Sequence, residues 1–128
     1  MIKMVNLENA KKTPAHYSAA IRADNVLYVS GQLPLDPVTR EARGKTIYEQ
    51  TLQALTNIEN LIKQENGGDR NQIVKTTAYV SDIAAWDEVN RAYKDFFGEY
   101  KPARTISEVH HIHFGFFVEI DATAVLNA

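Results

Sequence analysis

Residues 116–126, which read FFVEIDATAVL, carry the clearest strand pattern in the chain. Successive side chains of a β-strand point to opposite faces of a sheet, so a period of two divides this segment into two faces. One face takes the apolar residues Val118, Ile120, Ala122, Ala124 and Leu126. The other face takes Phe117, Glu119, Asp121 and Thr123. The pattern therefore predicts a sheet whose apolar face is covered by helices.

Two segments with helical periodicity can supply that cover. The first has apolar residues at steps of three and four and ends near Gly67-Gly68, a typical C-terminal stop. Its stripe consists of Tyr48, Leu52, Leu55, Ile58 and Ile62. The second segment ends at Gly98, and its stripe consists of Trp86, Val89, Tyr93 and Phe97. Both patterns are typical of amphipathic helices.

Four more strands are expected, at residues 19–23, 26–30, 73–80 and 104–109. Asp24-Asn25 separates the first two and tolerates the left-handed geometry of a two-residue hairpin turn. The resulting order, β-β-α-β-α-β-β, predicts one α+β domain over residues 1–128, with both helices on one face of a single sheet. The opposite face presents Tyr79, Phe117 and Val125 beside polar residues. Either self-association covers it or it stays partly solvated.

The composition excludes several classes of function. The chain has 128 residues, of which 45% are hydrophobic and 23% charged, which is enough for one core. A formal net charge of −2 without a basic run argues against nucleic acid as a partner. The chain has no cysteine, and its first twelve residues alternate polar and apolar positions without the apolar core of a signal peptide. No stretch is long enough to span a membrane, so a cytoplasmic location is expected.

Two charged residues are candidates for chemistry. Arg104, in Pro102-Ala103-Arg104, stands where a loop ends and a strand begins, and its guanidinium can offer two donors to a carboxylate. The alternative is an ordinary surface arginine. Glu119 lies within the long final strand between Val118 and Ile120, where it can act as a general base. It can equally be a charge on the solvated face of a two-sided strand, since Asp121 shares that face.

Two further motifs have a functional and a structural interpretation. His111 and His113, next to His110, are spaced so that two imidazoles share one face of an extended segment, but no adjacent carboxylate ligand is evident and no metal is expected. Ser30-Gly31 follows a strand, where a glycine lets a ligand approach the backbone, although a plain turn explains it equally well. No cofactor is implied by any motif.

Taken in order, a set of short motifs resembles the reactive intermediate deaminase family, known as RidA or YjgF. The resemblance runs from Pro14 to the C-terminus. Its motifs are Tyr17-Ser18, Tyr28-Val29-Ser30-Gly31-Gln32, Ile73-Val74-Lys75-Thr76-Thr77, Val89-Asn90 with Tyr93, Phe96-Phe97, Pro102-Ala103-Arg104 and Val118-Glu119-Ile120. Each motif is common alone, whereas the ordered set is specific.

The resemblance implies a fold like that of the barrel-type bacterial chorismate mutase, with three subunits around a central barrel and ligand sites in the clefts between subunits. It implies hydrolysis of 2-imino or enamine acids such as 2-iminobutanoate and 2-iminopropanoate to 2-oxo acids and ammonia. Arg104 would bind the substrate carboxylate and Glu119 would position the water. The other residues expected at the same pocket are Tyr17, Ser30, Gly31, Asn90, Ile106 and His113.

Three departures from the family pattern put the substrate range in doubt. The loop between Phe97 and Pro102 is about three residues shorter. Ile106 stands where members often have cysteine, and His110 to Phe114 replace a more usual Leu-Pro stretch. The alternatives left open are a sensor that binds a small carboxylate or 2-oxo acid without turnover, and a deaminase for a larger enamine. Ribonuclease activity is disfavoured because the chain is slightly acidic.

Overall fold

The computed structural model describes residues 1–127, so Ala128, the last residue of the expected domain, lies outside the described part. It shows a six-stranded sheet in the order β1-β2-β3-β6-β4-β5. The strands are β1 (Ile2–Val5), β2 (Ala20–Ala23), β3 (Val26–Gln32), β4 (Ile73–Val80), β5 (Ala103–Glu108) and β6 (Val118–Val125). The helices are α1 (Ile47–Gln64) and α2 (Trp86–Phe97), with short 3₁₀ turns η1 (Arg70–Gln72), η2 (Ile83–Ala85) and η3 (His113–Gly115). This is the α+β fold that the sequence predicts.

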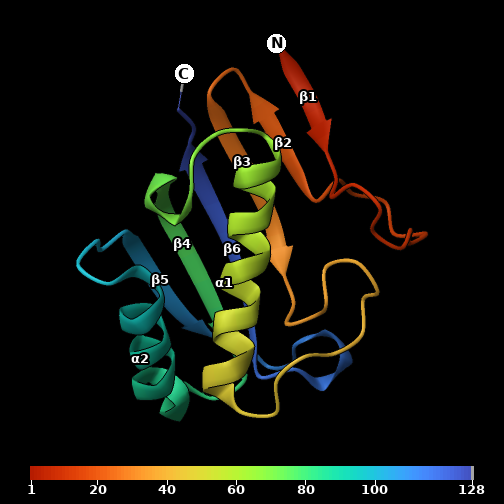
Figure 1. The fold of residues 1–128 in the computed structure, drawn as a ribbon. Coiled ribbons are helices and arrows are strands. Elements are labelled where there is room, and N and C mark those ends of the chain that lie inside the picture. The colour runs from red at the N-terminus through yellow and green to blue at the C-terminus, as the bar shows by residue number, and fades with distance from the viewer. Residues whose placement is uncertain (128) are drawn as a thin grey trace.

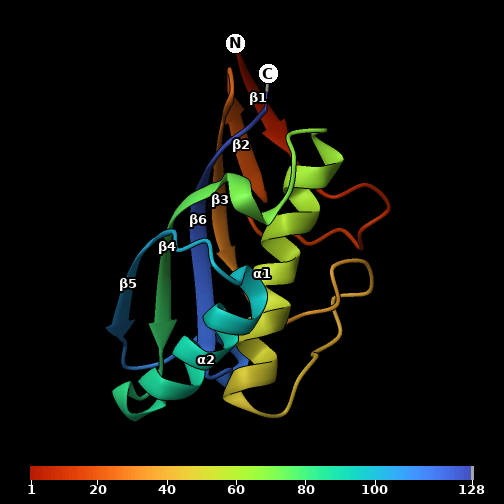
Figure 2. The same ribbon diagram turned by 60° about the vertical axis from the view of Figure 1, so that its left-hand side comes forward.

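Both α-helices lie on the same side of the sheet, as Figures 1 and 2 show. We call the side that carries them the helix face and the opposite side the open face. β6 lies in the middle and pairs antiparallel with β3 and β4, whereas β4 and β5 are parallel because α2 carries the chain back between them. No helix within residues 1–127 is long and apolar enough to cross a membrane.

The first hairpin forms as predicted, but the strand before it was missed. Ala23 pairs with Val26, and Asp24 in the turn has a φ of 54°, which is the left-handed geometry expected there. β1 pairs antiparallel with β2, so the expectation of five strands was wrong by one. β1 has only four residues, of which Val5 alone is buried. An edge strand that buries one side chain leaves no periodic signal to recognise.

The alternation in β6 is confirmed by burial. Val118, Ile120 and Ala124 are completely buried, and they pack against a core built from both helices. The largest of the fully buried side chains around them are Leu27, Leu55, Ile58, Ile62, Ile73, Val80 and Val89. Most of both helical stripes faces the sheet, as predicted, but Trp86 is 42% exposed and Tyr48 donates a hydrogen bond to Asp95 of α2. The strand limits differ from the expected ones by one or two residues.

An ion pair between the partly exposed Arg70 and the buried carboxylate of Glu59 connects the two helices near η1. The Glu59 side chain is 5% exposed and accepts hydrogen bonds from Arg70 Nε at 2.9 Å and Nη2 at 2.9 Å. Arg70 Nη1 also donates to the carbonyl of Phe96 at 2.6 Å, and its guanidinium lies 3.9 Å above the Phe96 ring. One side chain of η1 thus contacts both α1 and the last turn of α2.

We expect Arg70→Met to lower the free energy of unfolding by about 3 kcal/mol, because it leaves the buried Glu59 carboxylate without its main partner. Urea unfolding at a fixed protein concentration measures this. The control is Arg91→Met, which breaks the exposed pair with Glu88 and costs about 1 kcal/mol or less. Equal losses in the two variants would contradict a structural role for the pair of Glu59 and Arg70.

Candidate functional site

Arg104 lies on the helix face, at the outer edge of the sheet. It is the second residue of β5, and its register partner on β4 is Thr76, a fully buried residue that faces the helices. Directly paired residues of neighbouring strands point to the same side of a sheet. The Arg104 side chain therefore extends toward α2.

Three residues of α2 surround the Arg104 guanidinium. Asn90 Oδ1 accepts a hydrogen bond from Arg104 Nη1 at 3.1 Å. The guanidinium carbon lies 4.9 Å from the ring centre of Tyr93 and 5.3 Å from that of Trp86, within the range of cation–π attraction. These residues are spaced by three and four positions, which places them on one side of the helix. They restrict where the guanidinium can point.

Tyr93 joins this cluster to the sheet. Its hydroxyl is 2.8 Å from the Thr76 hydroxyl, in a buried hydrogen bond. Burial raises the pKa of Tyr93 to about 12, so its ring stays neutral and its hydroxyl keeps its proton at physiological pH. A hydrogen bond between two neutral hydroxyls, and not an ion pair, therefore joins α2 to β4 beside Arg104.

Glu119 lies on the open face, as the alternation of β6 predicts. Its register partner on β4 is Tyr79, and its neighbours Val118 and Ile120 point into the core. Burial raises the pKa of the Glu119 carboxyl, the negative charge of Asp121 raises it further, and His113 acts in the opposite direction. Glu119 therefore binds a proton more readily than an ordinary surface glutamate.

Asp121 and Tyr79 complete a small polar cluster around Glu119. The Tyr79 hydroxyl donates to Asp121 Oδ2 at 3.2 Å. The charge of Asp121 is the largest influence that raises the pKa of Tyr79. Two carboxylates and a neutral phenol thus share the part of the open face where β4 and β6 meet.

Gly31 lies against Glu119 at an irregularity in the sheet. The register between β3 and β6 shifts between Val29 and Gln32, so Ser30 and Gly31 form a bulge. A Cβ at position 31 would lie only 2.9 Å from Glu119 Oε2. A larger residue at position 31 would therefore displace the Glu119 carboxylate, which is a role of this glycine that the sequence did not reveal.

The structure does not bring Arg104 and Glu119 together within one chain. Arg104 is on the helix face of β5, whereas Glu119 is on the open face of β6, and β4 lies between these strands. A single subunit therefore presents two separate half-sites. A ligand that contacts both residues needs a second copy of the chain.

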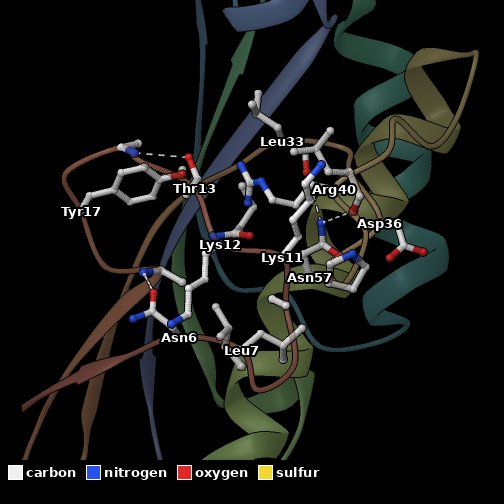
Figure 3. A pocket seen from close by; sticks show the side chains of 18 of the residues that line it. Asn6, Leu7, Lys11, Lys12, Thr13, Tyr17, Leu33, Asp36, Arg40 and Asn57 are labelled. Atoms are coloured by element: carbon white, nitrogen blue, oxygen red, sulfur yellow. Dashed lines mark hydrogen bonds between the residues drawn. The ribbon is translucent and has the colours of Figure 1, made fainter.

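Ser30 precedes Gly31 in the bulge, and Tyr17 lines the same surface cavity as Gly31. Ser30 Oγ donates to the carbonyl of Ser18 at 2.7 Å, which fixes the segment that carries Tyr17. Tyr17 is 54% exposed and lines this surface cavity, as Figure 3 shows. No histidine within residues 1–127 is hydrogen-bonded to Ser30, so its hydroxyl lacks the base that a serine nucleophile needs.

Ile106 lies on the same face as Arg104, whereas His113 is close to Glu119. Ile106 follows Arg104 by two residues on β5 and packs against the core on the helix face. His113 begins η3 and lies against Phe114, with ring centres 3.8 Å apart. His113 acts on Glu119, where it partly offsets the rise in the pKa of that carboxyl. Within residues 1–127, no group of three or more His, Asp or Glu side chains is arranged to hold a metal ion.

Sequence reasoning missed part of both half-sites. Trp86 was interpreted only as a member of an apolar stripe and Tyr93 as a member of that stripe and of a family motif, yet both flank Arg104. The spacing of Trp86, Asn90 and Tyr93 was the available signal, because an asparagine within an aromatic helix surface marks a place where a polar partner is needed. Asp121 was treated as a solvated charge, and no signal in the sequence pairs it with Tyr79.

The chain matches a known protein family over nearly its whole length. The family model described as Endoribonuclease L-PSP matches residues 7–126. A RutC family protein of Pyrococcus horikoshii is 38% identical over 97% of this chain and 98% of its own length. The 2-iminobutanoate/2-iminopropanoate deaminase of Mus musculus is 35% identical over 96% of this chain and 90% of its own.

Solved structures agree with this assignment. The crystal structure of the YjgF gene product of Escherichia coli superposes with a TM-score of 0.87 at 32% identity, covering 96% of this chain and 98% of that one. The match includes the order of the strands and the position of both helices, and the residues from Tyr17 to Glu119 lie within the part that the family model covers. The chain therefore belongs to the Endoribonuclease L-PSP family, which is also called the YjgF or RidA family.

Proposed function

We propose that this protein hydrolyses 2-imino acids, such as 2-iminobutanoate and 2-iminopropanoate, to 2-oxo acids and ammonia. The observation that carries the proposal is the state of Arg104. Within residues 1–127 the only hydrogen bond of its guanidinium is the one from Nη1 to Asn90, so its other side-chain N–H groups are free to donate. A guanidinium that is held by one nitrogen and open at the other suits two-pronged binding of a carboxylate.

Glu119 supplies the proton chemistry in this proposal. Arg104 holds the carboxylate so that the electrophilic imine carbon faces a water bound to Glu119. The carboxylate of Glu119 removes a proton from the water as its oxygen bonds to the imine carbon, and passes that proton to the nitrogen, which gives a carbinolamine. It then moves the remaining hydroxyl proton to the same nitrogen, so that the C–N bond breaks, ammonia leaves and the C=O bond forms. A carboxyl with a raised pKa is suited to both steps at near-neutral pH. No cofactor is required.

The relatives support a deaminase more than a nuclease. The mouse and cattle proteins, at 35% and 36% identity, are named 2-iminobutanoate/2-iminopropanoate deaminase. The family model takes its description from ribonuclease activity, but a formal net charge of −2 is opposite to what binding of a phosphate backbone favours. A cytoplasmic location stays a prediction that fits this metabolic role.

We further propose that the active site forms between two subunits of a homotrimer. The separation of Arg104 and Glu119 onto opposite faces supports it, because one subunit then contributes the arginine and its neighbour the glutamate. The open face also exposes apolar side chains that a neighbour can cover. Among them are Tyr28, Phe117 and Val125, each more than 40% exposed.

We expect Arg104→Ala to reduce the acceleration of 2-iminobutanoate hydrolysis by about a hundredfold, since the substrate loses its anchor. The imine is generated in situ by a threonine dehydratase, and its lifetime is followed in competition with semicarbazide. The control is Arg91→Ala, which removes an exposed arginine of α2. A fully active Arg104→Ala variant would rule out the assignment, and protection of the wild type by 2-oxobutanoate without turnover would indicate a sensor.

The pH dependence of the reaction reports on Glu119. The base must be deprotonated, so activity falls as the pH drops through the pKa of Glu119, and the raised pKa places this fall above the ordinary value of 4.5. Asp121→Asn removes a negative charge that raises this pKa, so the acidic limb should move to lower pH. Glu99→Gln makes the same charge change on an exposed residue after α2 and should leave the limb in place. An unmoved limb in Asp121→Asn would assign the titration to another group.

Mixing two inactive variants tests the site between subunits. Subunits carrying Arg104→Ala and subunits carrying Glu119→Gln are unfolded together and reassembled at equal concentrations. If each site takes its arginine from one subunit and its glutamate from another, about a quarter of the sites regain both residues by random assembly. Each variant reassembled alone is the control. An inactive mixture, with mixed trimers confirmed by native mass spectrometry, would show that both residues act from one chain.

A further inference from the structure

A cavity of about 500 Å³ opens between the N-terminal segment and the loop that follows β3. Figure 3 shows that its labelled side chains come from these two walls and from α1. The N-terminal wall includes Asn6, Leu7, Lys11, Lys12, Thr13 and Tyr17, and the loop wall includes Leu33, Asp36 and Arg40. Its volume lies in the range of small-molecule sites. Neither Arg104 nor Glu119 is among the described residues that line it, but Tyr17 and Gly31 are, so the cavity adjoins the Glu119 half-site.

The walls of this cavity are held in place by hydrogen bonds from α1. Gln64 accepts from the N–H of Glu8 at 2.8 Å and donates to the carbonyl of Asn6 at 2.8 Å, which fixes the start of the N-terminal wall. Asn57, which is 5% exposed, donates to the carbonyls of Leu33 at 3.2 Å and Leu35 at 2.9 Å, which fixes the loop wall. The cavity is thus preformed on both sides.

A backbone hydrogen bond joins the two walls directly. The N–H of Lys11 donates to the carbonyl of Val38 at 2.7 Å. This bond brings the lysine pair at positions 11 and 12 next to the loop that carries Arg40. Chain segments 27 residues apart in sequence therefore meet at the mouth of the cavity, where three cationic side chains gather.

The charge of the cavity is positive. Within residues 1–127, Lys11, Lys12 and Arg40 make no ion pair with a carboxylate. The one carboxylate in the lining, Asp36, is already occupied. It accepts from the N–H groups of Thr39 and Val38 at 2.9 Å each and pairs with Arg43 at 3.2 Å. These contacts, with the Thr39 bond foremost, hold the pKa of Asp36 below its usual range.

The rest of the lining is apolar. Leu7, Leu33, Leu35, Pro37 and Leu61 contribute to it. Unpaired cations around an apolar floor are the lining that a small organic anion requires, because the cations bind its charged group and the floor takes its carbon skeleton. Arg40 has the most constrained backbone of the three cations, because its φ is 64° and its N–H donates to the backbone carbonyl of Asp36 at 2.8 Å.

We propose that this cavity is a second ligand site, which adjoins the Glu119 half-site at Tyr17 and Gly31 but does not include Arg104, and that it binds a small organic dianion. The shared chemistry is a dianion, either a phosphate ester or a dicarboxylate. Three unpaired cations against one occupied carboxylate favour a double over a single negative charge. The proposal does not depend on imine hydrolysis and stands if that activity is absent.

Isothermal titration of the assembled protein tests the site, with inorganic phosphate and succinate as the two probes in buffers of matched ionic strength. At least one probe should bind saturably at one site per chain. Tighter binding of phosphate assigns a phosphate ester, and tighter binding of succinate assigns a dicarboxylate. Absence of saturable binding by both probes at millimolar concentration would overturn the proposal.

Variants locate the binding. Arg40→Asn removes the cation while keeping a residue that tolerates positive φ, so the protein should stay folded and bind the probe about tenfold more weakly. Lys11→Gln with Lys12→Gln should have an equal or larger effect. Lys94→Gln, at an exposed position of α2, also removes one positive charge but lies outside the cavity lining, so this variant should bind the probe as the wild type does. If Arg104→Ala abolishes binding while Arg40→Asn leaves it unchanged, the anion occupies the Arg104 site and the inference is wrong.

Discussion

The structure depends on the two-residue period of β6 in the middle of the sheet. β6 pairs with β3 on one side and β4 on the other, so its register sets that of both neighbours. Val118, Ile120 and Ala124 bury completely under the helices, and a shift by one residue would bring the charged Glu119 into the core. The hydrophobic effect thus fixes which residues of β6 face away from the core.

The same constraint places the chemistry. Once the apolar residues of β6 point to the helices, Glu119 and Asp121 must point to the open face, where they share a partly desolvated surface with Tyr79. β5 is the edge strand and contributes Arg104 to the helix face instead. The two charges that the proposed reaction requires are therefore separated by the sheet itself. This separation is the physical reason for our proposal that the protein acts as an assembly.

Polar contacts at the two half-sites serve different purposes. Around Arg104, the neutral rings of Trp86 and Tyr93 and the amide of Asn90 hold a cation without neutralising it, so its charge stays available to a ligand. Around Glu119, burial and a second carboxylate make the negative charge less stable. One half-site is suited to binding an anion and the other to exchanging a proton.

The sequence by itself determined the local elements and the faces of the long strand. The stripes of α1 and α2, the hairpin turn at Asp24 and the alternation around Glu119 follow from short-range periodicity, which a single chain segment carries. β1 was not predictable, since it gains its structure from pairing with β2. Only the tertiary structure decided that Gly31 faces Glu119 and that Arg104 reaches α2. These contacts arise from strand register and from segments far apart in the chain, and local periodicity contains no information about either.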